Sequence, residues 1–343
     1  MNAIRVVHIG CGGISNAWLD YVKNRKDIEL VGLVDLNKEV ADKRAVEHGL
    51  TGVEIGTDLK AVLRRTKPDV VFDCTVPEAH VTVTTTALQH GCHVLGEKPL
   101  ADTMPHAQKM VAAAKASGKI YAVMQNRRYA ANIQALRRFL KGGSIGRITT
   151  VHCDFIMGVH FGGFRDHMKH VLLLDMAIHT FDQARFLTGE DALTTLAHEW
   201  NPPGSWYDND ASAVAIFEMT NNVVYTYRGS WCAEGLPTPW EASWRIIEEQ
   251  GTVTWDGAYA FQAQVVTPGA TGFQRETRDV EVPYDRTAKI VAGHAGCIDE
   301  FIRCLRSGEL PQTVCTDNIK SLAMVHAAIE SAGKGQRIAC CSV

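Results

Sequence analysis

No stretch of this sequence is apolar over the length that a membrane-spanning helix needs. Its ten cysteines include no C-x-x-C pair, which favours buried reduced thiols over a zinc site or a disulfide framework. A one-sided charge is missing too, because 35 lysines and arginines are balanced by 38 aspartates and glutamates. The formal net charge of -3 supplies no strong field for nucleic acid or an anionic membrane. We therefore expect a small-molecule partner, no nucleic acid and no membrane.

The chain is long enough for more than one hydrophobic core. At 343 residues it exceeds the size at which a single core stops growing, so two domains are expected. Hydrophobic residues make up 46% and charged residues 21%, as in an ordinary soluble globular protein. A first strand that begins by residue 4 leaves no room for a signal peptide, so we expect a cytoplasmic protein.

A glycine-rich turn organises the first half of the chain. The apolar run at residues 4–9 leads directly into Gly10-Cys11-Gly12-Gly13-Ile14-Ser15, and a helix-compatible segment follows. Gly10 permits the tight turn, and the missing side chain at Gly12 lets the backbone approach a pyrophosphate at a helix N-terminus. The third fingerprint position is Ser15, a small departure from glycine. We predict that a dinucleotide contacts this turn through Gly10, Gly12, Gly13, Ile14 and Ser15.

An acidic residue ends the second apolar run, which spans residues 28–34. Asp35 lies about twenty residues beyond the turn, where a carboxylate accepts hydrogen bonds from an adenosine ribose and repels a 2′-phosphate. The pattern therefore favours NAD as the cofactor, with NADP less favoured.

Strands and helices alternate through residue 126. Further strands are predicted near residues 53–55, 69–75, 93–96 and 120–125, with helices between them. The segment 81–86 is β-branched and favours a strand on propensity, but the crossover between parallel strands demands a helix there. Residues 1-126 are thus predicted to form an α/β Rossmann domain with a doubly wound parallel sheet.

From about residue 147 the pattern changes to longer strands. They are expected at residues 147–157, 193–200, 211–219, 223–231, 242–248 and 252–255, with one strongly apolar helix at 172–187. Two helices, near residues 294–306 and 317–332, follow. Runs of strands with segregated helices indicate an α+β domain with a large, mostly antiparallel open sheet, which we assign to residues 127-343.

A lysine stands where a ligand would bind in the first domain. Glu97-Lys98-Pro99 follows the fifth predicted strand, at the carboxyl edge of the sheet. Pro99 restrains Lys98 to an extended backbone. A lysine beside a nicotinamide could polarise a substrate oxygen or carry its proton. The alternative is a solvated lysine that closes a strand.

Two ionisable residues interrupt the apolar predicted helix of the second domain. Asp175 and His179 are four residues apart, so they project from one face of a helix. Such groups are costly among apolar neighbours unless they are paired or functional. The carboxylate favours the protonated imidazole, and histidine is the natural proton acceptor near neutrality. The alternative is an Asp–His pair that is merely structural.

Four motifs, taken in order, resemble the signatures of one family. They are the glycine turn, Thr75-Val76-Pro77-Glu78-Ala79-His80, Glu97-Lys98-Pro99 and Asp175-Met176-Ala177-Ile178-His179. That family is the glucose-fructose oxidoreductase / inositol dehydrogenase / rhizopine-catabolism (Gfo/Idh/MocA) family, whose sequence motifs these segments resemble. The resemblance covers essentially the whole chain.

This resemblance implies NAD(P)-dependent oxidation or reduction of a sugar or cyclitol. It also implies an N-terminal Rossmann domain and a C-terminal domain with an open antiparallel sheet, whose free face commonly makes a subunit interface in the family. A homodimer or homotetramer is therefore expected. The implied catalytic group is Lys98, Asp175 and His179, and the residues implied near the cofactor are Thr75, Pro77, His80, Glu97 and Lys98.

One segment departs from the family pattern. The glycine-rich turn usual before the catalytic helix is replaced by His167-Met168-Lys169-His170. Arg165, His160, His167 and His170 could line a site for a polyhydroxylated ligand. Their clustering also invites a metal interpretation, but no spacing matches a helical zinc motif and the family usually needs no metal. No metal is therefore expected.

Two further groups are weaker candidates. Asn126, Arg127 and Arg128 follow the sixth predicted strand and could reach substrate or cofactor, or form an exposed basic turn. Aromatic residues of the second domain could stack on a sugar ring, although most are expected in the core or an interface; they are Trp206, Tyr207, Trp231, Trp240 and Trp244.

These expectations combine into an NAD-dependent sugar dehydrogenase. Hydride would leave a carbinol carbon for the nicotinamide while His179, oriented by Asp175, accepts the hydroxyl proton and Lys98 stabilises the alkoxide; Lys98 and His179 could exchange roles. With Arg165, these residues are also the expected substrate contacts. Oxidation of an aldose at C1 to a lactone, for example of a pentose or a branched sugar such as apiose, is preferred. The alternatives are a cyclitol or glycoside ring-hydroxyl dehydrogenase, an NAD-dependent glycosidase and a non-catalytic dinucleotide sensor.

Overall fold

The chain forms two compact units in the computed structural model, which describes residues 2–287 and 290–341. Described residues of Met1–Asn126 and Val291–Ile319 make up the first unit. Those of Arg127–Ile290 and Lys320–Ser342 make up the second. The predicted division assigned all of 127-343 to the second domain, whereas Val291–Ile319 instead returns to the first unit.

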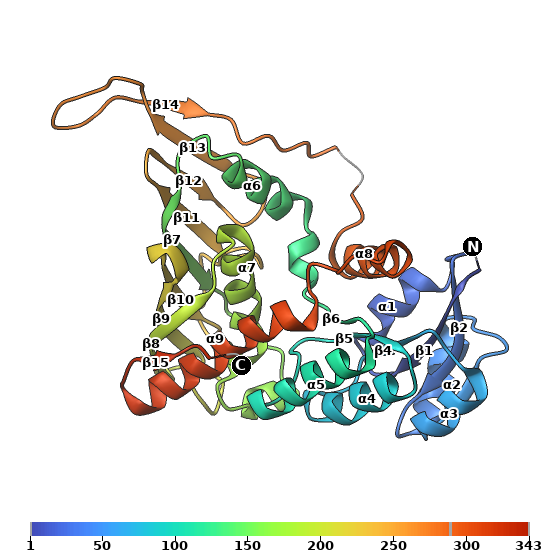
Figure 1. Ribbon diagram of the computed structural model, residues 1–343. Coiled ribbons are helices and arrows are strands. Elements are labelled where there is room, and N and C mark those ends of the chain that lie inside the picture. The colour runs from blue at the N-terminus through green and yellow to red at the C-terminus, as the bar shows by residue number, and fades with distance from the viewer. Residues whose placement is uncertain (1, 288–289, 342–343) are drawn as a thin grey trace. The chain divides into compact units, whose positions relative to one another are not determined.

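The first unit is built on six parallel strands in the order β3-β2-β1-β4-β5-β6 (Figure 1). The order reverses beside β1, and at such a switch point the carboxyl ends of the strands bind ligands. This sheet confirms the predicted Rossmann fold. The strands are β1 (Ile4–Ile9), β2 (Ile28–Val34), β3 (Glu54–Gly56), β4 (Val70–Asp73), β5 (His93–Gly96) and β6 (Tyr121–Val123). The helices between them are α1 (Ser15–Val22), α2 (Lys38–Glu47), α3 (Leu59–Thr66), α4 (Pro77–Gln89) and α5 (Met104–Ser117).

The β-branched segment 81–86 is helical, as the crossover rule predicted. It lies inside α4, whose first turn contains Pro77. Thr84 and Thr86 are buried, and the Thr85 hydroxyl donates to the carbonyl oxygen of Val81 at 2.6 Å. Because these hydroxyls and branched carbons are accommodated in the packed helix, tertiary packing overrides the local preference for a strand.

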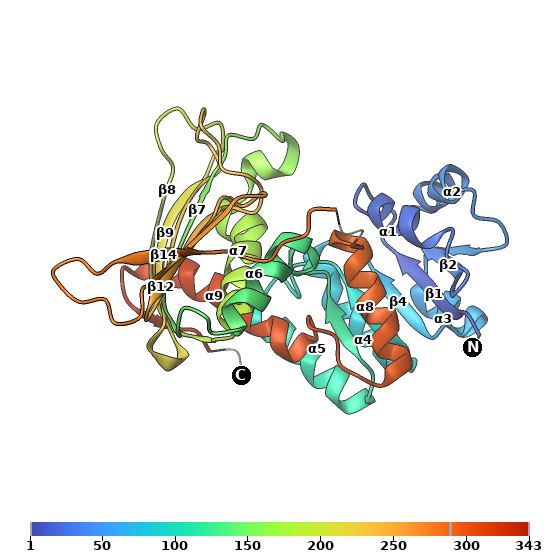
Figure 2. The same cartoon turned by 90° about the horizontal axis from the view of Figure 1, so that it is seen from above.

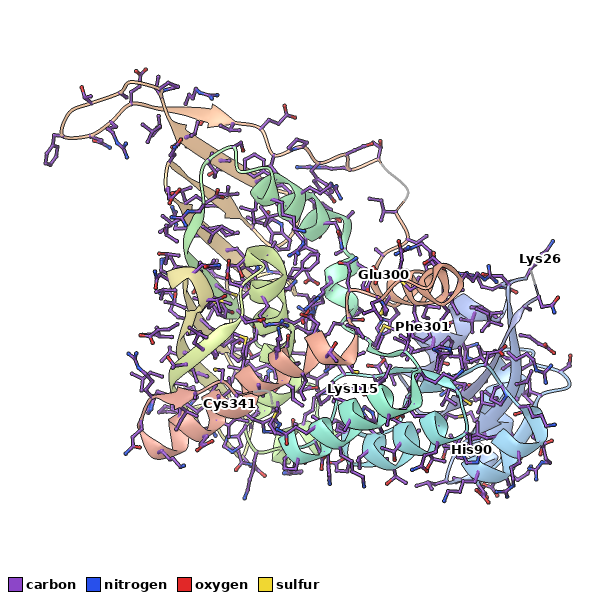
Figure 3. All side chains as sticks on the ribbon, viewed as in Figure 1. Lys26, His90, Lys115, Glu300, Phe301 and Cys341 are labelled. Atoms are coloured by element: carbon purple, nitrogen blue, oxygen red, sulfur yellow. The ribbon has the colours of Figure 1, made fainter. Side chains whose placement is uncertain are left out.

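Helix α8 (Gly293–Ser307) explains why a late segment belongs to the first unit. It lies beside α1 (Figures 1 and 2). Figure 3 labels Glu300 and Phe301, which are neighbours on α8. Phe301 is fully buried, whereas the carboxylate of Glu300 accepts hydrogen bonds from the side-chain and backbone N–H groups of Gln312 at 2.8 and 3.0 Å. The helix therefore buries an apolar face against the first unit.

The second unit is built on nine strands in the order β14-β13-β12-β11-β7-β10-β9-β8-β15. Among the described residues, every neighbouring pair is antiparallel except β7 with β10, which confirms the predicted, mostly antiparallel sheet. Three of these strands, β13, β14 and β15, were not predicted. The strands are β7 (Ile148–Ile156), β8 (Ala192–Trp200), β9 (Ser212–Met219), β10 (Val224–Ser230), β11 (Ser243–Glu248), β12 (Gly251–Trp255), β13 (Phe261–Val266), β14 (Thr277–Val280) and β15 (Ile338–Ala339).

One face of this sheet carries the core of the second unit. Helices α6 (Ala131–Lys141), α7 (Ile178–Thr188) and α9 (Cys315–Lys334) contribute to it (Figure 2). Phe181 of α7 packs edge-on against Phe217 and Tyr227, with ring centroids 4.8 and 5.2 Å apart. The other face is open and exposes apolar side chains, among them Leu196, Val214 and Ile216.

The cysteines are free thiols and most of them are buried, as their spacing indicated. Within residues 2–287 and 290–341, no helix is both long enough and apolar enough to cross a membrane.

Glu248, at the end of β11, is a buried acid. It is 4% exposed, and neither carboxylate oxygen has a hydrogen-bond partner among the described residues. Burial raises the pKa of Glu248 from 4.5 to about 8. The folded chain therefore holds a proton that the unfolded chain releases. This contribution to stability is complete below pH 4.5 and is lost as the pH rises through about 8.

We predict that Glu248→Gln flattens the decline of stability with pH. In this window the titration of Glu248 lowers the wild-type free energy of unfolding by up to about 1.4 kcal/mol per pH unit, and glutamine does not titrate. Urea unfolding at several pH values between 4.5 and about 8 measures how the free energy of unfolding of each variant changes with pH. The control is Glu249→Gln, whose side chain pairs with Arg147 at the surface. Equal pH dependence in the wild type and Glu248→Gln would refute the assignment.

Candidate active site

The predicted glycine turn has the conformation that its residues require. Gly10 has a φ of +88°, and a Cβ there would lie 2.4 Å from the carbonyl oxygen of Cys74. A Cβ on Gly12 or Gly13 would meet nothing within 4 Å, so both residues border open space. Ser15 is buried, and its hydroxyl donates to the carbonyl oxygen of Gly12 at 2.6 Å. The serine at the third fingerprint position therefore closes the turn by a hydrogen bond. Ile14 is 45% exposed at the start of α1.

A cavity of about 610 Å³ adjoins this turn. The exposed side chains of Leu36 and Val76 line it and provide apolar surface for a flat heteroaromatic base. Because the cavity is open beside the glycines and has apolar walls, it suits a dinucleotide. The predicted cofactor residues that line it are Gly10, Gly12, Asp35 and Thr75.

The carboxylate of Asp35 is oriented by main-chain donors. The N–H of Cys11 donates to Oδ2 at 2.8 Å, and that of Asn37 donates to Oδ1 at 2.9 Å. A ribose hydroxyl would find an acceptor here, whereas a 2′-phosphate would meet a like charge. Asp58 and Lys60 line the same cavity, and Lys60 is the one cation among the described lining residues.

The motif after β4 supports the loops near Lys98. The Thr75 hydroxyl donates to Oδ1 of Asp73 at 2.6 Å, and Pro77 begins α4. His80 is fully buried, with Nδ1 3.1 Å from the carbonyl oxygen of Pro99 and Nε2 3.0 Å from that of Thr75. His80 thus connects two loops and is not among the residues that line the cavity.

Glu97 is held by a network that the motifs did not predict. Trp18 Nε1 donates to its Oε1 at 2.7 Å, and His294 Nε2 lies 3.4 Å from the same oxygen. Nδ1 of His294 is 3.3 Å from the side-chain amide of Asn126. Although burial raises the pKa of Glu97, the hydrogen bond and charge of His294, with the Trp18 hydrogen bond, lower it on balance. The backbone N–H of Lys98 donates to Oε2 at 3.1 Å, so this network also fixes the chain at Lys98.

The helix predicted over residues 172–187 is not a single α-helix. Its first part, η3 (Leu172–Ala177), is a π-helix, and α7 begins at Ile178. The predicted α-helix is thus confirmed from Ile178 onward, whereas the part that carries Asp175 is a π-helix. A π turn accommodates an extra residue and is frequent at functional sites. His179, at the start of α7, is 7% exposed.

Arg165 reaches Asp175 from the turn η2 (Gly163–His167). Its Nε donates to Oδ2 of Asp175 at 2.6 Å. Its guanidinium lies over the rings of Phe161 and Phe164, 4.9 and 4.7 Å from their centroids. The aromatic rings and the carboxylate together hold the arginine in one orientation. Two of the four predicted substrate-binding residues, Arg165 and Asp175, are therefore in contact in the second unit.

Arg128 is not part of an exposed basic turn, so that alternative was wrong. Its side chain is 5% exposed, and Nε and Nη2 each donate to a carboxylate oxygen of Asp182 at 2.6 Å. The Ser321 hydroxyl donates to the same carboxylate at 2.7 Å. Asp182 is therefore a buried structural acid.

The aromatic candidates are mainly core residues, as expected. Tyr207, Trp231 and Trp244 are at most 3% exposed. Trp206 instead stacks on His160, with ring centroids 3.6 Å apart. His167 pairs at the surface with Asp208 at 2.5 Å.

Comparison with known proteins agrees with this geometry. Residues 4–125 match the model of an oxidoreductase family with an NAD-binding Rossmann fold, and residues 133–254 match the GFO/IDH/MocA C-terminal domain. The chain belongs to the Gfo/Idh/MocA oxidoreductase family. The family resemblance of the motifs is thereby confirmed, and the protein is an oxidoreductase that acts on CH–OH groups.

Individual relatives in the Gfo/Idh/MocA family share the length or the fold of the chain. D-apiose dehydrogenase of Paraburkholderia graminis is 27% identical over 96% of this chain and 88% of that protein. D-glucoside 3-dehydrogenase of Escherichia coli is 32% identical over 59% of each. A crystal structure of an oxidoreductase from Agrobacterium radiobacter in complex with NAD+, L-tartaric acid and magnesium has the same fold, with a TM-score of 0.85 at 21% identity over 98% of each chain.

We predict that His294→Ala destabilises the chain more than removal of a surface histidine does. The variant removes a hydrogen-bonding partner of the buried Glu97 carboxylate, which costs about 1–3 kcal/mol of the free energy of unfolding near neutral pH. The loss shrinks as the pH falls and Glu97 takes up its proton, because a lowered pKa stabilises only above the unfolded value. Urea unfolding measures both effects. The control is His106→Ala, which removes the partly exposed His106–Asp102 pair and costs less than about 1 kcal/mol. Equal losses in the two variants would contradict the role of His294.

Proposed function

We propose that this oxidoreductase is an NAD-dependent sugar dehydrogenase. The observation that carries the proposal is the retention of three proton-transfer groups, Lys98, Asp175 and His179, in a chain whose first unit keeps the cofactor turn. Asp35 supports NAD over NADP, because its carboxylate is fixed at the cavity that adjoins this turn.

In the proposed reaction Lys98, Asp175 and His179 have different roles. NAD, when bound, supplies the hydride acceptor. His179 accepts the proton of the substrate hydroxyl, and Asp175, itself held by Arg165, orients the imidazole. Lys98 stabilises the alkoxide as it develops. Lys98 and His179 could exchange these roles without changing the overall reaction.

The preferred substrate is an aldose that is oxidised at C1 to a lactone, such as a pentose or a branched sugar. The similarity to D-apiose dehydrogenase over nearly the whole chain supports this choice. Oxidation of a ring hydroxyl on a glycoside or cyclitol is the second candidate, which the similarity to D-glucoside 3-dehydrogenase supports. The exposed apolar side chains of the open sheet face support a homodimer or homotetramer.

The test follows NADH formation with NAD and with NADP over a panel of aldoses, cyclitols and glycosides. The proposal expects reduction of NAD by an aldose and release of a lactone. Release of a sugar from a glycoside without net NADH would instead establish a glycosidase. Binding of NAD in a calorimeter without turnover of any sugar would overturn the dehydrogenase proposal.

We predict that Lys98→Met lowers kcat by at least about 100-fold, because the methionine can neither stabilise the alkoxide nor carry its proton. His179→Asn gives a similar loss. Both variants retain the wild-type circular dichroism spectrum, and His179→Asn also retains the wild-type affinity for NAD. Unchanged turnover in either variant would remove that residue from the catalytic group.

We predict that Asp35→Ser narrows the preference for NAD over NADP by on the order of tenfold, because one like charge beside the 2′-phosphate is worth about 1 kcal/mol. The ratio of kcat/KM for the two cofactors is the measurement. Asp58→Asn is the matched control, since Asp58 lines the same cavity but caps α3. If both variants shift the ratio of kcat/KM for NAD to that for NADP equally, Asp35 does not discriminate between the two cofactors at the ribose.

A further inference from the structure

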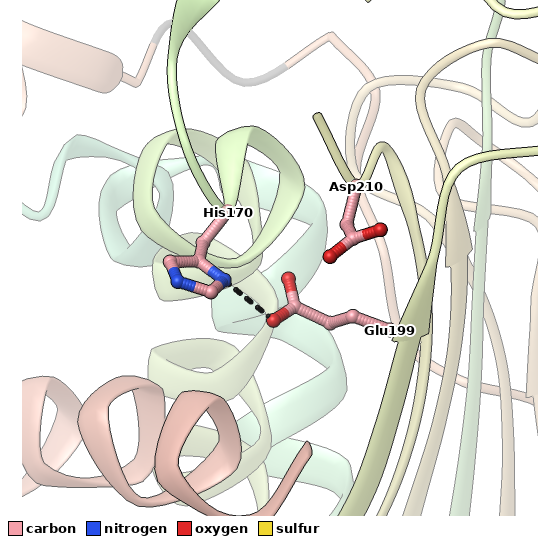
Figure 4. A group of neighbouring side chains, drawn as sticks. All are labelled: His170, Glu199 and Asp210. Atoms are coloured by element: carbon pink, nitrogen blue, oxygen red, sulfur yellow. Dashed lines mark hydrogen bonds and ion pairs between the residues drawn. The ribbon is translucent and has the colours of Figure 1, made fainter. Parts of the chain in front are cut away.

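Three side chains that could ligate a metal ion form a cluster in the second unit, and none of them is among the residues proposed for catalysis. His170 comes from the turn before η3, Glu199 from β8 and Asp210 from the loop before β9. Figure 4 shows the three side chains converging. Each offers one ligand atom, and these atoms all lie within 4.8 Å of one another.

Glu199 provides evidence that the cluster holds a ligand. Its side chain is 3% exposed, and His170 Nδ1 lies 2.7 Å from Oε2. The other oxygen, Oε1, is buried and has no hydrogen-bond partner in the described part of the chain. In Figure 4 this side of the carboxylate faces the carboxylate of Asp210. A buried, unpartnered carboxylate oxygen beside a second carboxylate is unfavourable unless a cation or a proton lies between them.

One imidazole does not pair with both acids. His170 contacts Oε2 of Glu199, so Oε1 of Glu199 is left facing the carboxylate of Asp210. A divalent ion between the two carboxylates supplies positive charge and occupies the unused oxygen.

We propose that His170, Glu199 and Asp210 bind one divalent transition-metal ion of borderline softness, such as Mn²⁺ or Zn²⁺. One imidazole and two carboxylates suit these ions, whereas Ca²⁺ and Mg²⁺ prefer oxygen ligands alone. On binding, the ion displaces the proton that His170 shares with Glu199, and water completes its coordination. This proposal replaces the expectation from spacing that the chain holds no metal, because the three ligands come from separate segments.

The ion has a structural role in this arrangement. It ties the turn that leads into η3, and therefore into Asp175, to β8 and to the loop before β9. The same loop is already joined to η2, which precedes this turn, because the backbone N–H of Asp208 donates to the carbonyl oxygen of Asp166 at 2.8 Å. The metal thus fixes the segment from which Arg165 reaches Asp175.

The test uses the full chain without an affinity tag, stripped of metal with a chelator. Isothermal titration calorimetry with Mn²⁺ and with Zn²⁺ measures stoichiometry and affinity, and thermal unfolding with and without each ion measures linkage to folding. We expect one ion per chain and a midpoint of unfolding that rises with metal concentration. Glu199→Gln and Asp210→Asn should each weaken binding by at least about tenfold, the loss that even an outer-shell partner produces.

The matched control is Asp208→Asn, which removes the surface pair with His167 close to the cluster and should leave metal affinity unchanged. Because Asp210 is only partly buried, Asp210→Asn keeps the test valid if Glu199→Gln fails to fold. No stoichiometric binding by the wild type, or wild-type affinity in Asp210→Asn, would overturn the proposal. Neither sugar nor NAD is present in the test, so its outcome is independent of the proposed dehydrogenase activity.

Discussion

The buried ion pair between Arg128 and Asp182 is the constraint on which the second unit's chemistry depends. Burial of two charges costs several kcal/mol unless their hydrogen-bonding groups are satisfied. Here the guanidinium binds the carboxylate through two nitrogens, and Ser321 of α9 donates to the same carboxylate. Arg185, one turn along α7, donates in turn to Ser321 at 2.9 Å. These hydrogen bonds join α7 to Arg128 and to α9, and they hold the helix that carries His179 against its neighbours.

An equivalent constraint acts in the first unit through Glu97. This carboxylate is buried beside Trp18 and His294, and its second oxygen accepts the backbone N–H of Lys98. The acid of the Glu97-Lys98-Pro99 motif is therefore a support for the backbone of the lysine. In both units a buried carboxylate, satisfied by residues distant in the sequence, positions an element that carries a candidate catalytic group.

The sequence was sufficient where structure depends on local rules. The Rossmann sheet could be predicted because its strands are buried apolar runs separated by helices. Gly10 and Asp35 could be predicted because the glycine turn and the end of the next strand occur at a fixed spacing. Strand β13 was missed although the exposed Gln262 and Gln264 alternate with the buried Ala263 and Val265, the pattern of a strand with one buried face. His294 was missed because it reaches Glu97 from a late helix of the chain. No spacing rule joins His170, Glu199 and Asp210, whose proximity arises only from the folded sheet.

The most direct measurement follows the hydride itself. The protein is incubated with NAD and an aldose deuterated at C1, and the reduced nicotinamide is analysed by mass spectrometry. The account predicts that deuterium moves from C1 to the nicotinamide ring. Reduced cofactor that carries no deuterium would place the oxidation at another carbon, and a cofactor that stays oxidised with every sugar tested would contradict the dehydrogenase function.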